Sequence, residues 1–347
     1  MFKGALRITV LILAILIIGG VGYLLKLVIP GTPSKSASLR FVGYIPLPKT
    51  KVLNVLDYMS VYGNDLFVAD ESGGTVSKVD LHGATLPVEA DVKSLEGKAA
   101  AHGVVIDPAS HTAFVSRSEE NVVDVFDPAT MQLITSIPVA DDPDGIFYDP
   151  QTKLIYVGSG DANMGTVIDP AKRAVSASIP LGGKPEYAAL DPQAHLLYQN
   201  LESTDEVVSI DLEKHSVVER WKLDGCSGPT GMAIDATNRR LFIACSTNAK
   251  VAVFNLESHR VAITLPIGPN PDSIAFDPTL RRLYSAGRAG VTTVVQQDTP
   301  DSYHVMDNIH THYGAHTLAV DPVSHRVYIG YASLFVKPRV AVFDVVQ

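Results

Sequence analysis

The sequence is poor in cysteine and in basic residues. Two cysteines among 347 residues exclude a disulfide framework and a cysteine-rich zinc module. The 28 Lys and Arg residues stand against 37 Asp and Glu, and the formal net charge is −9. Because nucleic-acid binding begins with neutralisation of phosphates by basic groups, this balance argues against nucleic acid as a partner.

Several catalytic signatures are also missing. The chain contains no G-x-S-x-G, no H-E-x-x-H, no phosphate-binding glycine loop and no dinucleotide fingerprint. A C-x-x-C-H haem attachment site is absent as well. No catalytic residue and no cofactor is therefore assigned from motifs, and whether the protein is an enzyme stays open.

The N-terminus contains one long apolar run. Ile8–Leu25 is uncharged over 18 residues, which is long enough for a transmembrane helix, and Lys3 and Arg7 precede it. We expect residues 1–29 to be a membrane anchor, followed by a polar linker at residues 30–38. A cleaved signal peptide is the alternative, although such peptides have shorter apolar cores. Under either interpretation the rest of the chain is exported. This favours a location at a bacterial-type inner membrane, with the body in the periplasm or outside the cell.

The body, residues 39–347, is built from an internal repeat. An apolar stretch ends in Asp or Asp-Pro, a turn follows, and an aromatic-containing stretch comes next. The Asp falls at Asp107, Asp149, Asp191, Asp235, Asp277 and Asp321, with spacings of 42 to 44 residues, and Tyr62 occupies it in a degenerate first copy. Helical periodicity is absent from these copies. Seven copies of about four short strands predict an all-β, seven-bladed β-propeller.

The chain ends suggest how the ring closes. The last copy stops after its third strand, RVAVFDVVQ, whereas Leu39–Pro48 resembles a fourth strand and precedes the first copy. We expect this N-terminal segment to complete the last blade, because closure removes an exposed sheet edge. The repeated Asp is expected to be structural, since Asp-Pro at a strand end starts a turn.

The copies resemble the YVTN-type repeats of YncE-like β-propellers, a WD40/YVTN-like class. Nearly all of residues 40–347 take part, and IYVGS and LFVAD come nearest to the YVTN tetrapeptide, which is itself absent. The resemblance implies a seven-bladed fold and an exported location. It implies little about chemistry, because similar propellers include binding proteins, lactonases and dehydrogenases.

The first strand of each copy is expected to line the central channel. Five residues before the Asp register, the side chain is expected to face the channel mouth. The seven residues at this position are Asp57, His102, Asp144, Glu186, Thr230, Asp272 and His316. Six of these seven residues have ionisable side chains, so we expect a ligand-binding site at the mouth.

His316, Asp57 and His102 fall on three consecutive blades of a closed ring. Two histidines and a carboxylate form a candidate site for a divalent transition metal, with His310 and His312 nearby as additional partners. The alternative is that the polar ring only hydrates the channel or binds neighbouring backbone. Arg117, at the end of a second strand, is a further candidate for holding an anionic ligand, or else an ordinary surface arginine.

Cys226 and Cys245 lie at the ends of antiparallel strands of one copy. An exported protein favours a disulfide between them, and two buried free thiols are the alternative. Two functions follow from these observations: a ligand- or protein-binding scaffold that acts through the channel mouth, or a metal-dependent, lactonase-like hydrolase. The expected partners are the membrane and an unidentified protein or small-molecule ligand.

Overall fold

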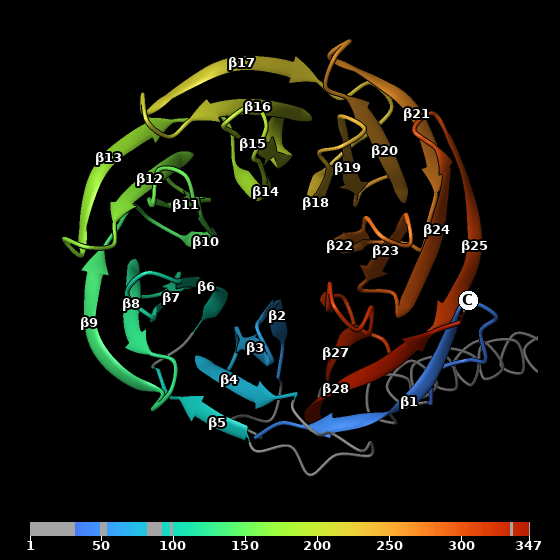
Figure 1. Cartoon of the computed structure of the whole chain (residues 1–347), viewed down its shortest axis with the longest axis horizontal. Helices are drawn as coiled ribbons and strands as arrows, with labels where there is room; N and C mark the ends of the chain where they lie inside the picture. Colours follow the sequence, from blue (N-terminus) through green and yellow to red (C-terminus); the bar gives the residue numbers. More distant parts are fainter. Residues whose placement is uncertain (1–31, 49–53, 82–91, 98–99, 334–335, 347) are drawn as a thin grey trace, which may run out of the picture.

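Seven four-stranded antiparallel sheets surround a central axis in the computed structural model of the chain (Figure 1). The structure describes residues 32–48, 54–81, 92–97, 100–333 and 336–346. This confirms the prediction of an all-β, seven-bladed propeller. None of the helices in those ranges is long and apolar enough to span a bilayer, and the predicted anchor, residues 1–29, lies outside them.

Each blade runs from an innermost to an outermost strand. Blade 1 contains β2 (Leu56–Tyr62), β3 (Asp65–Asp70), β4 (Thr75–Asp80) and β5 (Val92–Leu95). Blade 2 contains β6 (Ala101–Asp107), β7 (Thr112–Arg117), β8 (Val122–Asp127) and β9 (Gln132–Pro138). Blade 3 contains β10 (Pro143–Tyr148), β11 (Ile155–Ser159), β12 (Met164–Asp169) and β13 (Ala174–Pro180). Blade 4 contains β14 (Pro185–Asp191), β15 (Leu196–Leu201), β16 (Glu206–Asp211) and β17 (Ser216–Lys222), with a short 3₁₀ helix at Glu202–Thr204.

The last three blades follow the same plan. Blade 5 contains β18 (Pro229–Asp235), β19 (Arg240–Cys245), β20 (Lys250–Asn255) and β21 (Arg260–Pro266). Blade 6 contains β22 (Pro271–Asp277), β23 (Arg282–Gly287), β24 (Val291–Thr299) and β25 (Ser302–His310). Blade 7 contains β26 (Leu318–Val320), β27 (Val327–Ser333) and β28 (Val336–Val345), and its outer strand is β1 (Leu39–Pro46).

The two ends of the propeller meet in blade 7. Strand β1 pairs antiparallel with β28, from Leu39 opposite Val345 to Pro46 opposite Arg339. The predicted closure by the N-terminal strand is therefore confirmed, although the strand ends at Pro46 and not at Pro48. Figure 1 shows β1 and β28, from opposite ends of the colour bar, side by side.

The repeated Asp closes the turn between the first and second strands. The Asp107 carboxylate accepts hydrogen bonds from the Ala109 amide and the Ser110 hydroxyl. The same pattern recurs at Asp149, Asp191, Asp235, Asp277 and Asp321. The carboxylate thus satisfies turn amides, as Asx turns do, and the structural interpretation of this residue is confirmed.

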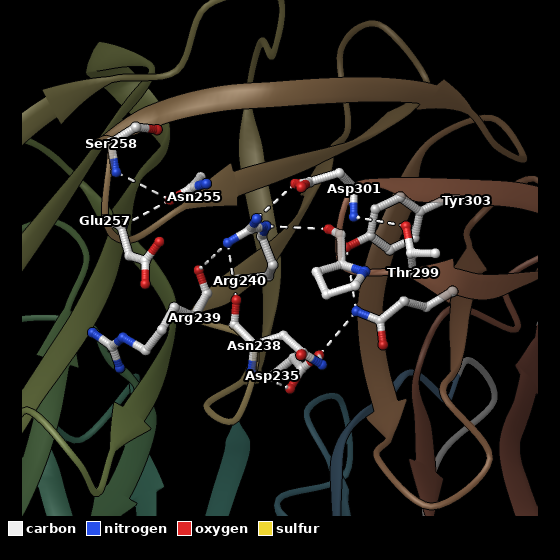
Figure 2. A network of polar contacts seen from close by, with 12 residues as sticks. Asp235, Asn238, Arg239, Arg240, Asn255, Glu257, Ser258, Thr299, Asp301 and Tyr303 are labelled. Carbon is white, nitrogen blue, oxygen red and sulfur yellow. Dashed lines mark hydrogen bonds and ion pairs between the residues drawn. The ribbon is translucent and has the colours of Figure 1, made fainter.

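The core lies between neighbouring blades. Second strands are apolar on both faces because a sheet packs on either side of them; Phe114 and Phe242, for example, are fully buried. Blades 5 and 6 are also joined by a polar network around the buried Arg240 (Figure 2). Its guanidinium donates to the Pro300 carbonyl and to Asp301 at the tip of the β24–β25 hairpin.

A register shift in the first strand prepares the channel mouth. In six blades the first strand has a register shift against the second strand within its first residues, as between Leu56 and Met59 of β2. These first strands are β2, β6, β10, β14, β18 and β22. Irregularities of this kind bend a strand and re-aim its side chains. Six of the predicted mouth residues lie in these irregular segments, one after the first residue of each strand, whereas His316 lies two residues before β26.

Candidate functional site

The structure brings the predicted mouth residues of blades 1, 2 and 3 into direct contact. Nδ1 of His102 is hydrogen-bonded to Asp57 and lies 3.5 Å from Oδ1 of Asp144. Nε2 of His102 lies 2.8 Å from the Ser118 hydroxyl. One ligand atom from each of Asp57, His102 and Asp144 lies within 4.8 Å of the others. We call these three residues the acidic corner.

The opposite charges of His102 and Asp57 determine which of these two groups holds a proton. Burial alone would lower the pKa of His102, but the hydrogen bond and charge of Asp57 outweigh it and raise that pKa to about 10. Burial opposes ionisation of Asp57 too, yet the bond to His102 leaves its pKa lowered. At neutral pH the pair is therefore an imidazolium bound to a carboxylate.

Asp144 differs from Asp57 because it has no cation of its own. Burial, with the charge of Asp57, raises the pKa of Asp144 to about 7 in spite of His102. Its Oδ1 is buried and has no hydrogen-bond partner within the described ranges. The carboxyl group is thus divided between its neutral and charged forms near neutral pH.

Two further pairs complete the mouth. Nζ of Lys184 lies 3.0 Å from Glu186, but burial and the charge of Asp144 still raise the pKa of Glu186 to about 8. On the other side, Arg288 lies 2.8 Å from Asp272. Burial raises the pKa of Asp272, although the charges of His316 and Arg288 oppose this shift.

His316 lies beside Asp272 and is held in one orientation. Its Nδ1 is 2.6 Å from the Gly314 carbonyl and must donate a proton to it. Its Nε2 is 3.6 Å from Oδ2 of Asp272 and has no hydrogen-bond partner among the residues described, while the side chain is 4% exposed. The nearest carboxylate to His316 is therefore Asp272.

The predicted metal set is only partly assembled. His102 and Asp57 are in contact, but the third member of their cluster is Asp144, whereas His316 pairs with Asp272. The two additional histidines lie elsewhere: His310 is exposed at the end of β25, and His312 is buried and stacks on Tyr331. Whether the mouth binds a metal stays a prediction.

Thr230 and Arg117 make structural contacts. The Thr230 hydroxyl donates to the Pro271 carbonyl of the next blade. Arg117 is 2% exposed and is bonded to Asp124 and, at 2.7 Å, to the Gly74 carbonyl. It is therefore not a surface arginine: Nε is bonded within blade 2 and Nη1 to blade 1, while Nη2 has no hydrogen-bond partner among the described residues.

The two cysteines, on blade 5, form a disulfide. Cys226 and Cys245 are bonded to each other, with their Cα atoms 5.2 Å apart. Both lie near the start of the first strand of that blade, since Cys245 pairs with Pro229. The link fastens the loop that enters blade 5 to its second strand.

Two tyrosines that were not predicted from the sequence meet on the channel axis. Tyr58 follows Asp57 on blade 1, and Tyr187 follows Glu186 on blade 4; their ring centroids are 4.8 Å apart. The charges of Asp144, Asp57, Glu186 and Asp272 all act, after burial, to raise the pKa of Tyr58. Its hydroxyl therefore lies close to carboxylates from four blades. The sequence signal was an aromatic residue directly after the mouth position in two copies.

Comparison with known proteins supports the fold. A scan against protein-family models and a search of curated protein sequences found no match. Among solved structures, one described as Kuenenia stuttgartiensis hydrazine synthase is similar, with a TM-score of 0.52 at 18% sequence identity. The similarity covers 72% of this chain and 97% of that one. At this identity it shows the propeller fold alone, and the YVTN-type resemblance stays a prediction.

Proposed function

We propose that this propeller is a binding module held at a membrane by its N-terminal segment, and that its channel mouth takes a positively charged ligand. The fold is one that commonly serves binding or scaffolding. The apolar run Ile8–Leu25 supports membrane attachment, and the disulfide between Cys226 and Cys245 supports an oxidising compartment such as the periplasm.

The observation that carries the proposal is the unmatched carboxylate of Asp144. Three of the four mouth carboxylates have a cationic partner each: Asp57 has His102, Glu186 has Lys184 and Asp272 has Arg288. Asp144 has only a longer contact, 3.5 Å, to the same Nδ1 of His102 that Asp57 already binds. A buried carboxylate without a partner is costly, so a bound cation would stabilise the mouth.

The test is cation binding by the full chain, purified with detergent. Isothermal titration with Ca²⁺, Zn²⁺ and small organic ammonium ions should reveal at least one saturable cation, and Asp144→Asn should weaken it at least tenfold. Glu257→Gln, an exposed carboxylate on the β20–β21 turn, is the matched control and should leave binding unchanged. Absence of binding by every cation would refute the proposal.

A second candidate is a metal-dependent hydrolase, because the acidic corner groups one histidine and two carboxylates within metal-ligand reach. Asp57, His102 and Asp144 would hold the ion, which would polarise a carbonyl or activate water. Glu186, whose pKa of about 8 keeps a proton available near neutral pH, would serve as the acid. Elemental analysis and lactone hydrolysis by wild type and His102→Ala test this. Without stoichiometric metal, this candidate falls.

A further inference from the structure

Aromatic side chains lie across the channel axis beside the mouth residues. In a ring of seven blades, blades 1 and 4 are as far apart as any two, so the contact between Tyr58 and Tyr187 must cross the axis. Phe147 of blade 3 packs edge-on against Tyr187 at 4.9 Å. We call the mouth residues together with these rings the cup, and we call Tyr58, Tyr187 and Phe147 its aromatic floor.

Three other blades have glycine where blades 1 and 4 have these tyrosines. At the position after the mouth residue, blades 2, 3 and 5 have Gly103, Gly145 and Gly231. A Cβ on Gly103 would lie 2.7 Å from Ile146, and one on Gly231 would lie 2.4 Å from the Asp272 carbonyl. Glycine at these positions therefore lets the first strands of neighbouring blades approach closely.

The wall of the cup carries two buried atoms that lack hydrogen-bond partners within the described ranges, Oδ1 of Asp144 and Nε2 of His316. The first is an acceptor when the carboxyl is ionised. The second is an acceptor in the neutral ring, because Nδ1 holds its proton against the Gly314 carbonyl. The cup thus presents two acceptor atoms without hydrogen-bond partners among the described residues, one of them on the carboxylate of Asp144, beside aromatic rings.

We propose that the ligand of this cup is a compact primary ammonium ion, bound to Asp144 through its N–H groups and seated over the aromatic floor. The proposal rests on the cation-binding function argued above and names the class of cation. An ammonium group offers three donors and a charge, and aromatic faces attract cations.

The acidic corner suits an ammonium ion better than a metal ion. Nδ1 of His102 is the nitrogen that faces both carboxylates, and it carries the proton of the bond to Asp57. A metal must displace that proton to reach the nitrogen. An ammonium ion needs only oxygen acceptors, and it leaves the bond between His102 and Asp57 in place.

The experiment is saturation-transfer NMR on the full chain in detergent with three probes of similar size: propylammonium, neutral 1-propanol and tetramethylammonium, which has charge but no N–H. We expect saturable binding of propylammonium, none of 1-propanol, and at least tenfold weaker binding of tetramethylammonium. Asp144→Asn should abolish propylammonium binding, and Glu257→Gln should retain it. Tyr187→Leu should weaken it about tenfold, whereas Tyr187→Phe should keep it within about threefold.

The outcomes separate the two proposals. If Zn²⁺ or Ca²⁺ binds and propylammonium does not, the mouth is a cation site but the ammonium assignment is wrong. If neither binds, both proposals fail. Equal binding of propylammonium by wild type and Asp144→Asn overturns the assignment. Should Asp144→Asn not fold, as judged by circular dichroism, the three probes on the native chain decide: equal binding of propylammonium and 1-propanol refutes the role of charge.

Discussion

Replacing Asp144 by Asn should stabilise the ligand-free protein above neutral pH. The folded state raises the pKa of this carboxyl from 3.8 to about 7, chiefly by burial. Between these two values the folded state holds a proton that the unfolded state has released, so stability falls as pH rises. The loss stops once the pH passes the folded-state pKa. Asn has no carboxyl proton to lose, so the stability of the Asp144→Asn variant does not fall with pH in this way.

The magnitude follows from the size of the shift. One pKa unit corresponds to about 1.4 kcal/mol, so the full shift costs the wild type about 4 kcal/mol as an upper bound. Because 21% of the Asp144 side chain reaches solvent, we expect less. Between pH 5 and pH 8 the advantage of Asp144→Asn over wild type should grow by about 2 kcal/mol, or about 5 °C in melting temperature.

The assay is thermal unfolding of wild type and Asp144→Asn at pH 5, 6, 7 and 8 in one ionic strength, without added amines or divalent metals. Asp161→Asn, an exposed carboxylate on the same blade, is the control and should follow the wild type throughout. Melting curves of Asp144→Asn and wild type that stay parallel from pH 5 to pH 8 would show that Asp144 is not an unmatched buried charge. The argument for a cation site would then lose its basis.

Three further predictions concern the scaffold. The double variant Cys226→Ser/Cys245→Ser should lose about 3 kcal/mol in reversible urea unfolding, because the disulfide closes a loop with a sequence separation of 19; unchanged stability under reducing conditions would contradict this. Asp124→Asn should cost about 3 kcal/mol by leaving the buried Arg117 unpaired, and calorimetry that finds no loss would refute it. Gly231→Ala should lower the melting temperature by several degrees, since its Cβ would meet a backbone carbonyl at 2.4 Å; a neutral result would mean that blades 5 and 6 can separate at little cost.

The ring could be predicted from the sequence because the repeat spans the whole body of the chain and can be counted without a structure. Six Asp-centred copies and a first copy with Tyr62 in that position fixed the number of blades, and the missing fourth strand of the last copy pointed to Leu39–Pro48 as the closing segment. The mouth position was also predictable, since it follows from a fixed offset within each copy. Each of these inferences needs only spacing along the chain.

The pairing within the mouth was not predictable from that offset. Which carboxylate faces which cation depends on the first-strand irregularities and on residues outside the register, such as Lys184 and Arg288. Consecutive blades suggested His316, Asp57 and His102 as one cluster, but the side chain of His316 turns to Asp272 because its ring is bound to the Gly314 carbonyl. Contacts across the axis, such as the tyrosine pair, are invisible to any argument from neighbouring blades.

The pH dependence of binding separates the ammonium ion from the metal ion at this mouth. Both need Asp144 ionised, so both affinities should rise with pH up to about 7. In Glu186→Gln, which lacks the neighbouring carboxyl whose pKa is about 8, the ammonium affinity should level off beyond that point, because the ammonium ion displaces no proton from His102. A metal held by His102 must still displace a proton from a group whose pKa is about 10, so its affinity should climb by up to tenfold per pH unit between 7 and 10. Titrations of propylammonium and Zn²⁺ at pH 6, 7, 8 and 9 measure this; a propylammonium affinity that keeps rising above pH 8, while the probe itself stays charged, would mean that proton loss from His102 accompanies its binding.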